Sequence, residues 1–218
     1  MMITIKKALT DASFVKRGNT FFRVHGEGIL QVIKPDKNAI NFGLFSMYSR
    51  LLPQWFTPLG CIPRYSIGEL MDQRCQCILS QAQYLLSDGL PWLESINTHK
   101  AMLDGLLLLE TKNGRNVRWI DEQKIAPFLV CEDYTSAEKV ICAILENHRI
   151  AKEINKTLYT SKADYQKYVE RRTKDDEGLL RLLEMVHHRN KQEIRLYLMD
   201  NYTRNAQFAN FCTCKDRN

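Results

Sequence analysis

Long hydrophobic runs are absent from this 218-residue sequence, whose longest uninterrupted aliphatic stretch is Leu106–Leu109. A membrane-spanning helix needs about 20 apolar residues, so we expect no membrane partner. The charged start at Lys6 and Lys7 is not followed by the apolar segment of a signal peptide. Seven cysteines are an odd number, unlike the paired framework of a short secreted chain. These features predict a cytoplasmic protein with reduced thiols.

Proline and glycine are scarce in the C-terminal part of the chain. None of the six prolines lies after Pro127, and Gly178 is the only one of the ten glycines that does. Because both residue types interrupt helices, this composition predicts that residues 128–218 are mainly helical. The preceding part is richer in turn-forming residues, which favours strands and connecting turns.

Three segments of the N-terminal part show the two-residue periodicity of β-strands. They are Thr20–His25, Gly28–Lys34 and Ala39–Tyr48. We therefore predict an α+β protein, in which a small antiparallel sheet packs on helices and a mainly helical C-terminal half follows. The predicted domains are an α+β domain over residues 1–112 and a helical extension over residues 113–218.

Apolar residues recur at helical spacing over Ser66–Ser87, which predicts one long helix that is broken at Gly89–Pro91. Residues 98–110 are predicted to form the next helix. The alternative is a hairpin within residues 106–120 that turns at Asn113-Gly114. We favour the helix because the apolar spacing before Gly114 is helical and glycine suits a helix end.

The C-terminal half is predicted to contain three helices. The first follows a capping-box pattern at Thr135–Glu138. The second is shorter, begins at Ser161–Asp164 and carries the aromatic residues Tyr165 and Tyr168. Apolar residues over Leu179–Leu198 define the third.

Four separated motifs of the first half resemble family 4304 of bacterial domains of unknown function. They are Ser13–Arg23, Gly28–Val32, Ile40–Leu44 and Cys61–Arg64 ahead of Ile67–Leu70. The resemblance covers roughly residues 1–112 and implies a sheet followed by packed helices. It implies no known activity.

The chain departs from the pattern of that family after Arg64. Ser66 stands where a second basic residue is expected, and the tryptophans expected near Arg74–Gln76 are missing. Any polar site that members of the family share is therefore in doubt here.

Polar residues within the predicted strands form the main candidate site, which consists of Arg23, His25, Gln31, Asn41 and Arg64. An arginine fork matches carboxylates and other anions, so one interpretation is an anion-binding pocket. The other is a hydrogen-bonded network that holds the strands in register, since buried polar groups are costly unless they are paired. We favour the network, because no nucleophile or carboxylate base accompanies these residues.

A zinc site is the alternative role for four of the cysteines, which are Cys75, Cys77, Cys212 and Cys214. The C-x-C spacing is less typical of zinc sites than C-x-x-C. Two cysteines at this spacing on a helix also point to different sides. We therefore expect no metal and no cofactor.

Aromatic and basic residues alternate in the tail in a way that suits nucleic-acid binding. They are Tyr159, Tyr165, Tyr168, Arg171, Arg172 and Lys174. Acidic residues interrupt this pattern, and the net charge of +6 is spread along the chain. We favour a solvated helix face with core-facing tyrosines, so nucleic acid is not an expected partner.

No phosphate-binding loop, dinucleotide fingerprint, nucleophile elbow or zinc-protease motif occurs in the sequence. We therefore favour a non-enzymatic binding or interaction protein that holds a protein partner on its sheet or its helical tail. An immunity-type partner of a bacterial toxin is one concrete form of this hypothesis. The alternative is an enzyme acting on a small molecule or phosphate ester through Arg23, His25 and Arg64. The sequence leaves the oligomeric state open.

Overall fold

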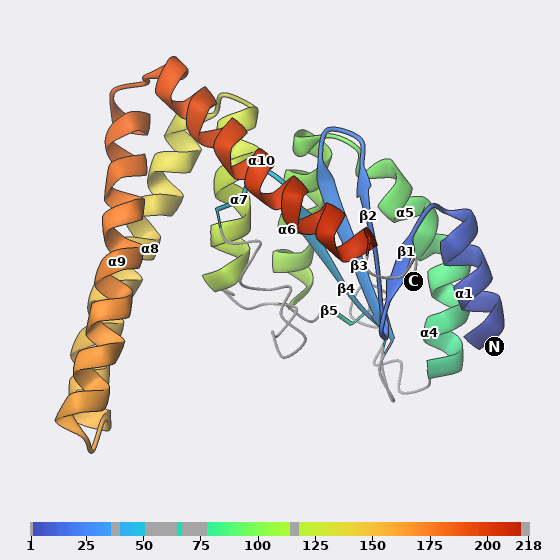
Figure 1. Ribbon diagram of the computed structural model, residues 1–218, viewed down its shortest axis with the longest axis horizontal. Helices are drawn as coiled ribbons and strands as arrows, with labels where there is room; N and C mark the ends of the chain where they lie inside the picture. The colour runs from blue at the N-terminus through green and yellow to red at the C-terminus, as the bar shows by residue number, and fades with distance from the viewer. Residues whose placement is uncertain (1, 36–39, 51–64, 67–77, 114–117, 215–218) are drawn as a thin grey trace.

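Five antiparallel strands form a meander in the order β1-β2-β3-β4-β5 (Figure 1). The strands are β1 (Val15–Arg17), β2 (Thr20–His25), β3 (Ile29–Pro35), β4 (Ile40–Ser46) and β5 (Tyr65–Ser66). This computed structural model describes residues 2–35, 40–50, 65–66, 78–113 and 118–214. The predicted α+β class and the predicted mainly helical C-terminal half are confirmed.

The register of the strands separates two buried faces. Arg23 pairs with Gln31, which pairs with Leu44, so these three side chains share one face. Phe22 and Val32 pair on the other face. The predicted alternation in β2, β3 and β4 is therefore confirmed.

The short strand β5 corrects one prediction. Ser66 was expected to begin a helix, but Tyr65 and Ser66 pair with Phe42 and Asn41 of β4. The apolar periodicity over residues 66–87 gives no sign of this pairing, because strand partners 23 and 25 residues away leave no local pattern. Residues 67–77 lie outside the described part, and the helix is described from Ile78 onward.

Helices from two parts of the chain cover the first face of the sheet. They are α1 (Met2–Asp11), α4 (Ile78–Tyr84), the π-helical segment η1 (Leu85–Gly89), α5 (Leu90–Ser95) and α6 (His99–Asn113). Leu9 of α1, Leu85 of η1 and Leu106 of α6 are each fully buried with Ile33 and Phe42 of the sheet. This cluster is the main apolar core of the N-terminal half.

The predicted helix break at Gly89–Pro91 is wrong. The chain stays helical through Gly89 because η1 makes one wider π turn and α5 follows directly. The Leu90 N–H donates to the Leu85 carbonyl oxygen, so helical bonding continues into α5, and Pro91 lies in the first turn of that helix. Trp92 and Leu93 follow in α5.

Helix α6 confirms the predicted helix and excludes the hairpin alternative, since helix α7 (Arg118–Val130) occupies residues that the hairpin would use. The two helices are joined by a buried ammonium group. Lys124 Nζ lies 2.6 Å from Glu110 Oε1 and 2.9 Å from Asp121 Oδ1. Burial alone would lower the pKa of Lys124, but the hydrogen bonds that Lys124 donates to Glu110 and Asp121 raise it overall.

Helix α10 (Lys191–Cys214) crosses the second face of the sheet and brings the C-terminus back beside β1 (Figure 1). Tyr202 and Ala206 pack on the apolar residues of that face, which include Phe22 and Leu30. Asn205 Nδ2 also donates to the carbonyl oxygens of Met47 (2.8 Å) and Ser49 (2.7 Å). The predicted domain division near residue 112 falls at the end of α6 and stays a prediction.

Helices α8 (Tyr134–Leu158) and α9 (Lys162–His187) form an antiparallel hairpin that projects from the rest of the molecule (Figure 1). We call the other elements the body. Ser161 caps α9 through a hydrogen bond from the Asp164 N–H, as predicted. The capping residue of α8 is Asp133, which accepts from the Ser136 N–H, so the predicted start two residues later is wrong.

The predicted boundary between the second and third tail helices is also wrong. The aromatic segment and the apolar residues after Leu179 belong to one helix, α9, which runs through Gly178. A single glycine costs a helix only about 1 kcal/mol, and packing on α8 offsets this. The chain turns instead at 188–190, where Arg189 has a φ of 50°. Within the described residues, no helix has the length and apolar content needed to span a bilayer.

Candidate functional site

The structure brings together three residues of the predicted polar cluster. Arg23 Nε donates to Gln31 Oε1 at 3.0 Å, and both side chains are buried. Gln31 Nε2 donates to the carbonyl oxygens of Leu93 (2.6 Å) and Ile96 (3.1 Å) at the end of α5. His25 Nε2 lies 3.1 Å from the Glu94 carbonyl oxygen in the same region.

The remaining groups of Arg23 are directed at protein atoms as well. Its Nη1 donates to the Ala12 carbonyl oxygen at 2.8 Å, and its Nη2 lies 2.6 Å from Glu94 Oε2. The guanidinium also stacks 4.6 Å from the centre of the Phe14 ring. This arrangement ties α1 and α5 to the sheet. It leaves the arginine fork no open side for an anion.

The other two predicted residues do not join this group. Asn41 lies on the opposite face of the sheet, because its register partner Lys34 is three residues from Gln31. Arg64 lies outside the described residues. Of the five residues of the predicted polar cluster, three therefore lie together in the described part of the chain.

The alternative zinc ligands are not placed by the described residues. Cys75 and Cys77 fall outside them, and the side chains of Cys212 and Cys214 in α10 are not described. In the described part of the chain, no group of three or more His, Cys, Asp or Glu side chains is arranged to hold a metal ion.

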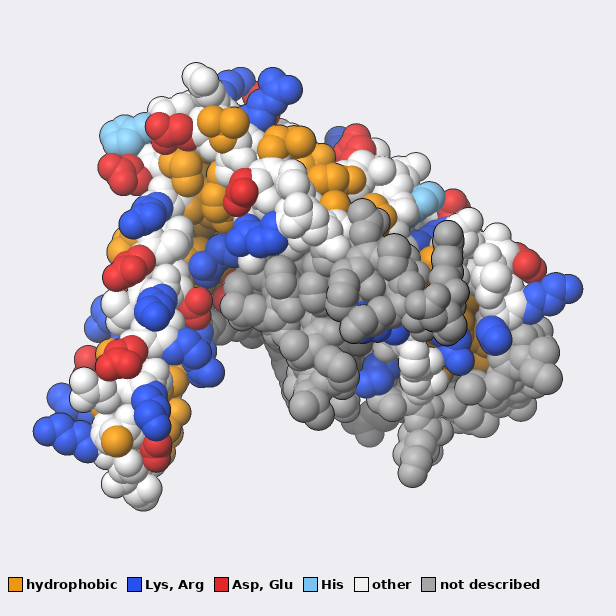
Figure 2. Space-filling model, in the orientation of Figure 1, with side chains coloured by type: hydrophobic (Ala, Val, Ile, Leu, Met, Phe, Trp, Pro, Cys, Tyr) orange, Lys and Arg blue, Asp and Glu red, His pale blue; other side chains and the backbone are white. Residues whose placement is uncertain are grey.

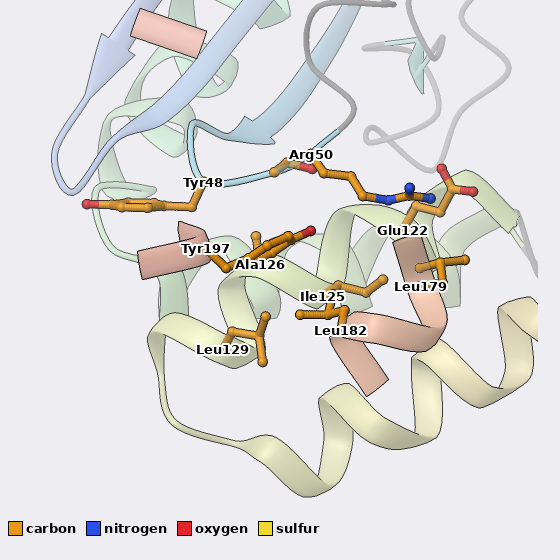
Figure 3. A pocket seen from close by; sticks show the side chains of 10 residues that line it. Tyr48, Arg50, Glu122, Ile125, Ala126, Leu129, Leu179, Leu182 and Tyr197 are labelled. Atoms are coloured by element: carbon orange, nitrogen blue, oxygen red, sulfur yellow. The ribbon is translucent and has the colours of Figure 1, made fainter. Parts of the chain in front are cut away.

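A small cavity marks the joint between the body and the hairpin (Figure 3). Its volume is about 20 Å³, and apolar side chains such as Ile125, Leu179 and Leu182 form much of its wall. Figure 3 shows Arg50 extending along the cavity toward Glu122. The space suits about one water molecule, so we assign it to packing and not to a ligand.

A wider groove lies between the β2–β3 turn, the start of α6, the α7–α8 turn and α10. Its volume is about 700 Å³, within the range of small-molecule sites. We call it the tyrosine groove. It is lined by Gly26, Glu27, Gly28, Tyr48, Thr98, His99, Lys100, Val130, Cys131 and Tyr202.

Aromatic rings form one wall of the tyrosine groove. The ring centres of Tyr48 and Tyr202 are 4.9 Å apart, and those of Tyr48 and His99 are 5.3 Å apart. Both tyrosines pack against Gly28, where a Cβ would lie 3.0 Å from Tyr202 Cε2. Burial raises the pKa of Tyr48, and Tyr202 and Glu27 raise it further, so its hydroxyl stays protonated at neutral pH.

A fixed carboxylate, that of Glu27, also lines the groove. Gly26 has a φ of 53°, and a Cβ there would lie 1.9 Å from the Asn97 carbonyl oxygen, so the turn needs glycine. The Glu27 N–H donates to that oxygen at 2.8 Å. Glu27 Oε2 accepts from the His99 N–H at 3.1 Å, and His99 Nδ1 lies 3.4 Å away.

Ser46, His99 and Glu27 are arranged in the order of a nucleophile, a base and an orienting acid. Ser46 Oγ lies 2.9 Å from His99 Nε2. However, Ser46 is 0% exposed and His99 only 1%, so a substrate has no access to the hydroxyl. Burial lowers the pKa of His99 despite the opposing effect of Glu27. Ser46 therefore acts as a buried partner of His99, and His99 in turn holds the Glu27 carboxylate.

Cys131 at the rim of the groove is not an activated nucleophile. Burial raises the pKa of its thiol, and Glu27 and Asp133 raise it further against the opposing effect of Lys100. The thiolate is the reactive form, so a raised pKa makes this cysteine a weak nucleophile at neutral pH. The groove is built for binding more than for covalent chemistry.

The projecting hairpin has an exposed apolar stripe. Ile150, Ile154 and Leu158 are spaced four residues apart on α8 and are 42%, 55% and 68% exposed. Residues 149–174 hold eight Lys and Arg and three Asp and Glu, a net charge of +5 against +6 for the whole chain. Figure 2 shows Lys and Arg side chains along the hairpin and at its free end.

Polar contacts hold this part of the hairpin together. His148 Nδ1 and Lys152 Nζ each lie 2.5 Å from a carboxylate oxygen of Asp176. Arg172 Nη1 lies 3.3 Å from His148 Nε2. The three tyrosines 159, 165 and 168 stack on one another with ring centres 5.6 to 6.4 Å apart.

Neither the tyrosine groove nor the apolar stripe was predicted from the sequence as a site. The groove combines residues from position 26 to position 202, so no spacing pattern connects them. The two glycines that flank Glu27 were the one local sign of a constrained turn. For the stripe, apolar residues spaced four apart are equally typical of a buried helix face, so the spacing alone does not identify an exposed one.

Comparisons with protein-family models, with curated proteins and with solved structures find no match to this chain. The resemblance to family 4304 of domains of unknown function stays a prediction.

Proposed function

We propose that this is a non-enzymatic, cytosolic interaction protein whose α8–α9 hairpin binds an acidic protein partner. The observation that carries the proposal is the exposed stripe of Ile150, Ile154 and Leu158 on a projecting hairpin. Aliphatic side chains at this spacing dock into apolar grooves of other proteins. The sheet of the body, by contrast, has both of its apolar faces covered, so it offers no comparable exposed surface.

The charge of the hairpin indicates the chemistry of the partner. A net charge of +5 over residues 149–174 favours an acidic surface, which would steer association and fix its register. The same charge disfavours pairing of this stripe with a second copy of the chain. An immunity-type interaction with a bacterial toxin is one concrete form of the proposal.

A nucleic-acid partner fits the hairpin less well than a protein. Bases need free aromatic faces for stacking, whereas Tyr165 and Tyr168 stack on each other and Tyr168 also faces Arg172 at 5.7 Å. Aliphatic residues form the exposed stripe itself. They match a protein groove and not a phosphate backbone.

The alternative enzyme would act through Arg23, His25 and Arg64. The polar groups of Arg23 and His25 contact residues at the end of α1 and in α5, as described above. Their arrangement therefore favours the interaction protein over this enzyme.

The test compares two double variants of the full chain in affinity capture from a native extract, followed by binding measurements with the purified partner. Ile154→Glu with Leu158→Glu alters the stripe. Leu196→Glu with Met199→Glu makes the same change on exposed residues of α10, which are 63% and 48% exposed.

We expect a stoichiometric acidic partner whose affinity falls at least about 100-fold in the stripe variant, as for loss of central apolar anchors. The α10 variant should bind as the wild type does. Equal binding by both variants would overturn the proposal. So would a nucleic acid as the captured species.

A further inference from the structure

We propose that the tyrosine groove is a binding site for an organic cation, a primary ammonium or guanidinium group on a flexible aliphatic chain. The proposal goes beyond the hairpin and does not depend on it. It rests on the presence of the Tyr48–Tyr202 ring pair and the exposed Glu27 carboxylate in the lining of one open groove of about 700 Å³.

The carboxylate is held in place before any ligand arrives. Gly26 and Gly28 fix the turn on both sides of Glu27, since a Cβ at either position would meet Asn97 or Tyr202. Glu27 Oε2 is held by His99, while the Glu27 side chain stays 56% exposed. A fixed and accessible carboxylate loses little freedom when it pairs with a cation, which favours affinity.

The tyrosine pair adds the second half of the site. The face of an aromatic ring attracts cations, and a cation between such a face and a carboxylate gains from both. The hydroxyl of Tyr48 is a neutral donor and acceptor at physiological pH, because the pKa of Tyr48 is raised. The wall thus carries no charge of its own.

The charges around the groove favour a cation although the whole chain is basic. At Cys131, three carboxylates act on the thiol, those of Glu27, Asp133 and Asp104, against the single ammonium of Lys100. Glu27 and Lys100 line the groove itself, and Asp104 and Asp133 add negative charge near Cys131.

Two sources can supply the same cation, a free amine or a Lys or Arg side chain of a peptide. Titration calorimetry with the full chain distinguishes them by using agmatine as the free cation and Nα-acetyl-arginine amide as the capped residue. Nα-acetyl-citrulline amide is the neutral control, because it has nearly the same shape as the arginine probe without its charge.

Two positions are varied. Glu27→Gln keeps the size of the side chain and an oxygen that can accept from His99. Its matched control is Glu146→Gln on the exposed face of α8, far from the groove along the hairpin. Tyr202→Phe keeps the ring face, whereas Tyr202→Leu removes it, and thermal melting verifies that each variant is folded.

We expect at least one of the two arginine-type probes to bind and the citrulline probe not to bind. Glu27→Gln should weaken binding by about tenfold or more, as for loss of a charged hydrogen-bond partner. Tyr202→Leu should weaken it by about threefold and Tyr202→Phe should not, given the usual strength of a cation–π contact. Tighter binding of the capped residue than of agmatine indicates a peptide source.

Three results would overturn the inference. They are equal binding of the citrulline probe, unchanged affinity in folded Glu27→Gln, and binding of neither cation. The stripe variants of α8 do not change the groove, so failure of the partner experiment would not affect the cation result. Likewise, failure of cation binding would not affect the partner experiment.

Discussion

The body and the outer part of the hairpin are held together by different forces. In the body, hydrogen bonds connect distant parts of the chain, as when Gln31 binds the carbonyl oxygen of Ile96, 65 residues away. Apolar cores lie on both faces of the sheet. In the hairpin, the buried apolar residues of α8 end at Ile144, and His148 takes the next inward position.

This difference teaches that one helical pair can change its mode of stabilisation along its length. Near the body, α8 and α9 share an apolar core with α7 and α10. Farther out, the contacts come from charged groups and tyrosines, with Asp176 at the centre. Apolar burial is insensitive to pH and salt, whereas charged contacts are sensitive to both. We therefore expect the outer hairpin to open independently of the body.

The largest expected effect comes from breaking the body at Gln31. Gln31→Leu removes the partner of Arg23 Nε and the donor to the Ile96 carbonyl oxygen, while the Leu93 carbonyl oxygen keeps its bond from the Ile96 N–H. Unpaired buried polar groups are costly, so we expect the free energy of unfolding to fall by about 3 kcal/mol. Urea denaturation followed by tryptophan fluorescence measures this change.

A double variant tests whether the loss of stability in Gln31→Leu comes from leaving the buried Arg23 side chain without its partner. Arg23→Leu with Gln31→Leu removes both partners, so the pair should cost less than the sum of the two single variants. Additive losses would show that the two side chains act independently. In each of these variants, the free energy of local opening of α8, measured by hydrogen exchange, should equal that of the wild type.

The second effect is confined to the hairpin. Asp176→Asn removes the carboxylate that receives both His148 and Lys152, and we expect local opening of the outer hairpin to become easier by about 2 kcal/mol. Hydrogen exchange of the amides in residues 148–176 measures this opening. Glu146→Gln, which affects an exposed pair with Arg149, should leave it unchanged. Equal exchange in both variants would contradict the role of Asp176.

The same carboxylate gives the hairpin an acid dependence. Burial alone would raise the pKa of Asp176, but hydrogen bonds from Lys152 and His148 lower it overall. A lowered pKa in the folded state stabilises the hairpin above the ordinary value of about 4, and this contribution is lost as the pH falls below it. The free energy of local opening, obtained from hydrogen exchange after division by the intrinsic exchange rate at each pH, should therefore fall toward acid in the wild type and much less in Asp176→Asn.

The smallest expected effect lies at the joint between the two regions. Gly178→Ala should stabilise the protein by about 0.5 kcal/mol, because alanine is the better helix former. The new Cβ would lie 3.0 Å from Arg50 Nη1, which can move because it ends a flexible side chain. Thermal melting measures the gain. The reverse change at an exposed helix position, Ala143→Gly, should give a loss of similar size, and a loss at Gly178 would show that Arg50 is held rigidly.

The sequence alone determined the local structure of most elements. The two-residue period of β2, β3 and β4 placed Arg23 and His25 on one face, and the scarcity of glycine and proline predicted the helical half. Ser161 was identified as a helix cap from its own neighbours. These features follow from contacts between residues close in the chain, so the pattern of residue types is enough to reveal them.

The tertiary structure decided which elements meet and what they enclose. It placed Asn41 away from Arg23, returned α10 to the second face of the sheet, and carried α5 through the expected break at Gly89. It also assembled the tyrosine groove from five separate segments. Such contacts depend on which buried surfaces fit together, and residues as far apart as Gly26 and Tyr202 leave no periodic trace of that fit in the sequence.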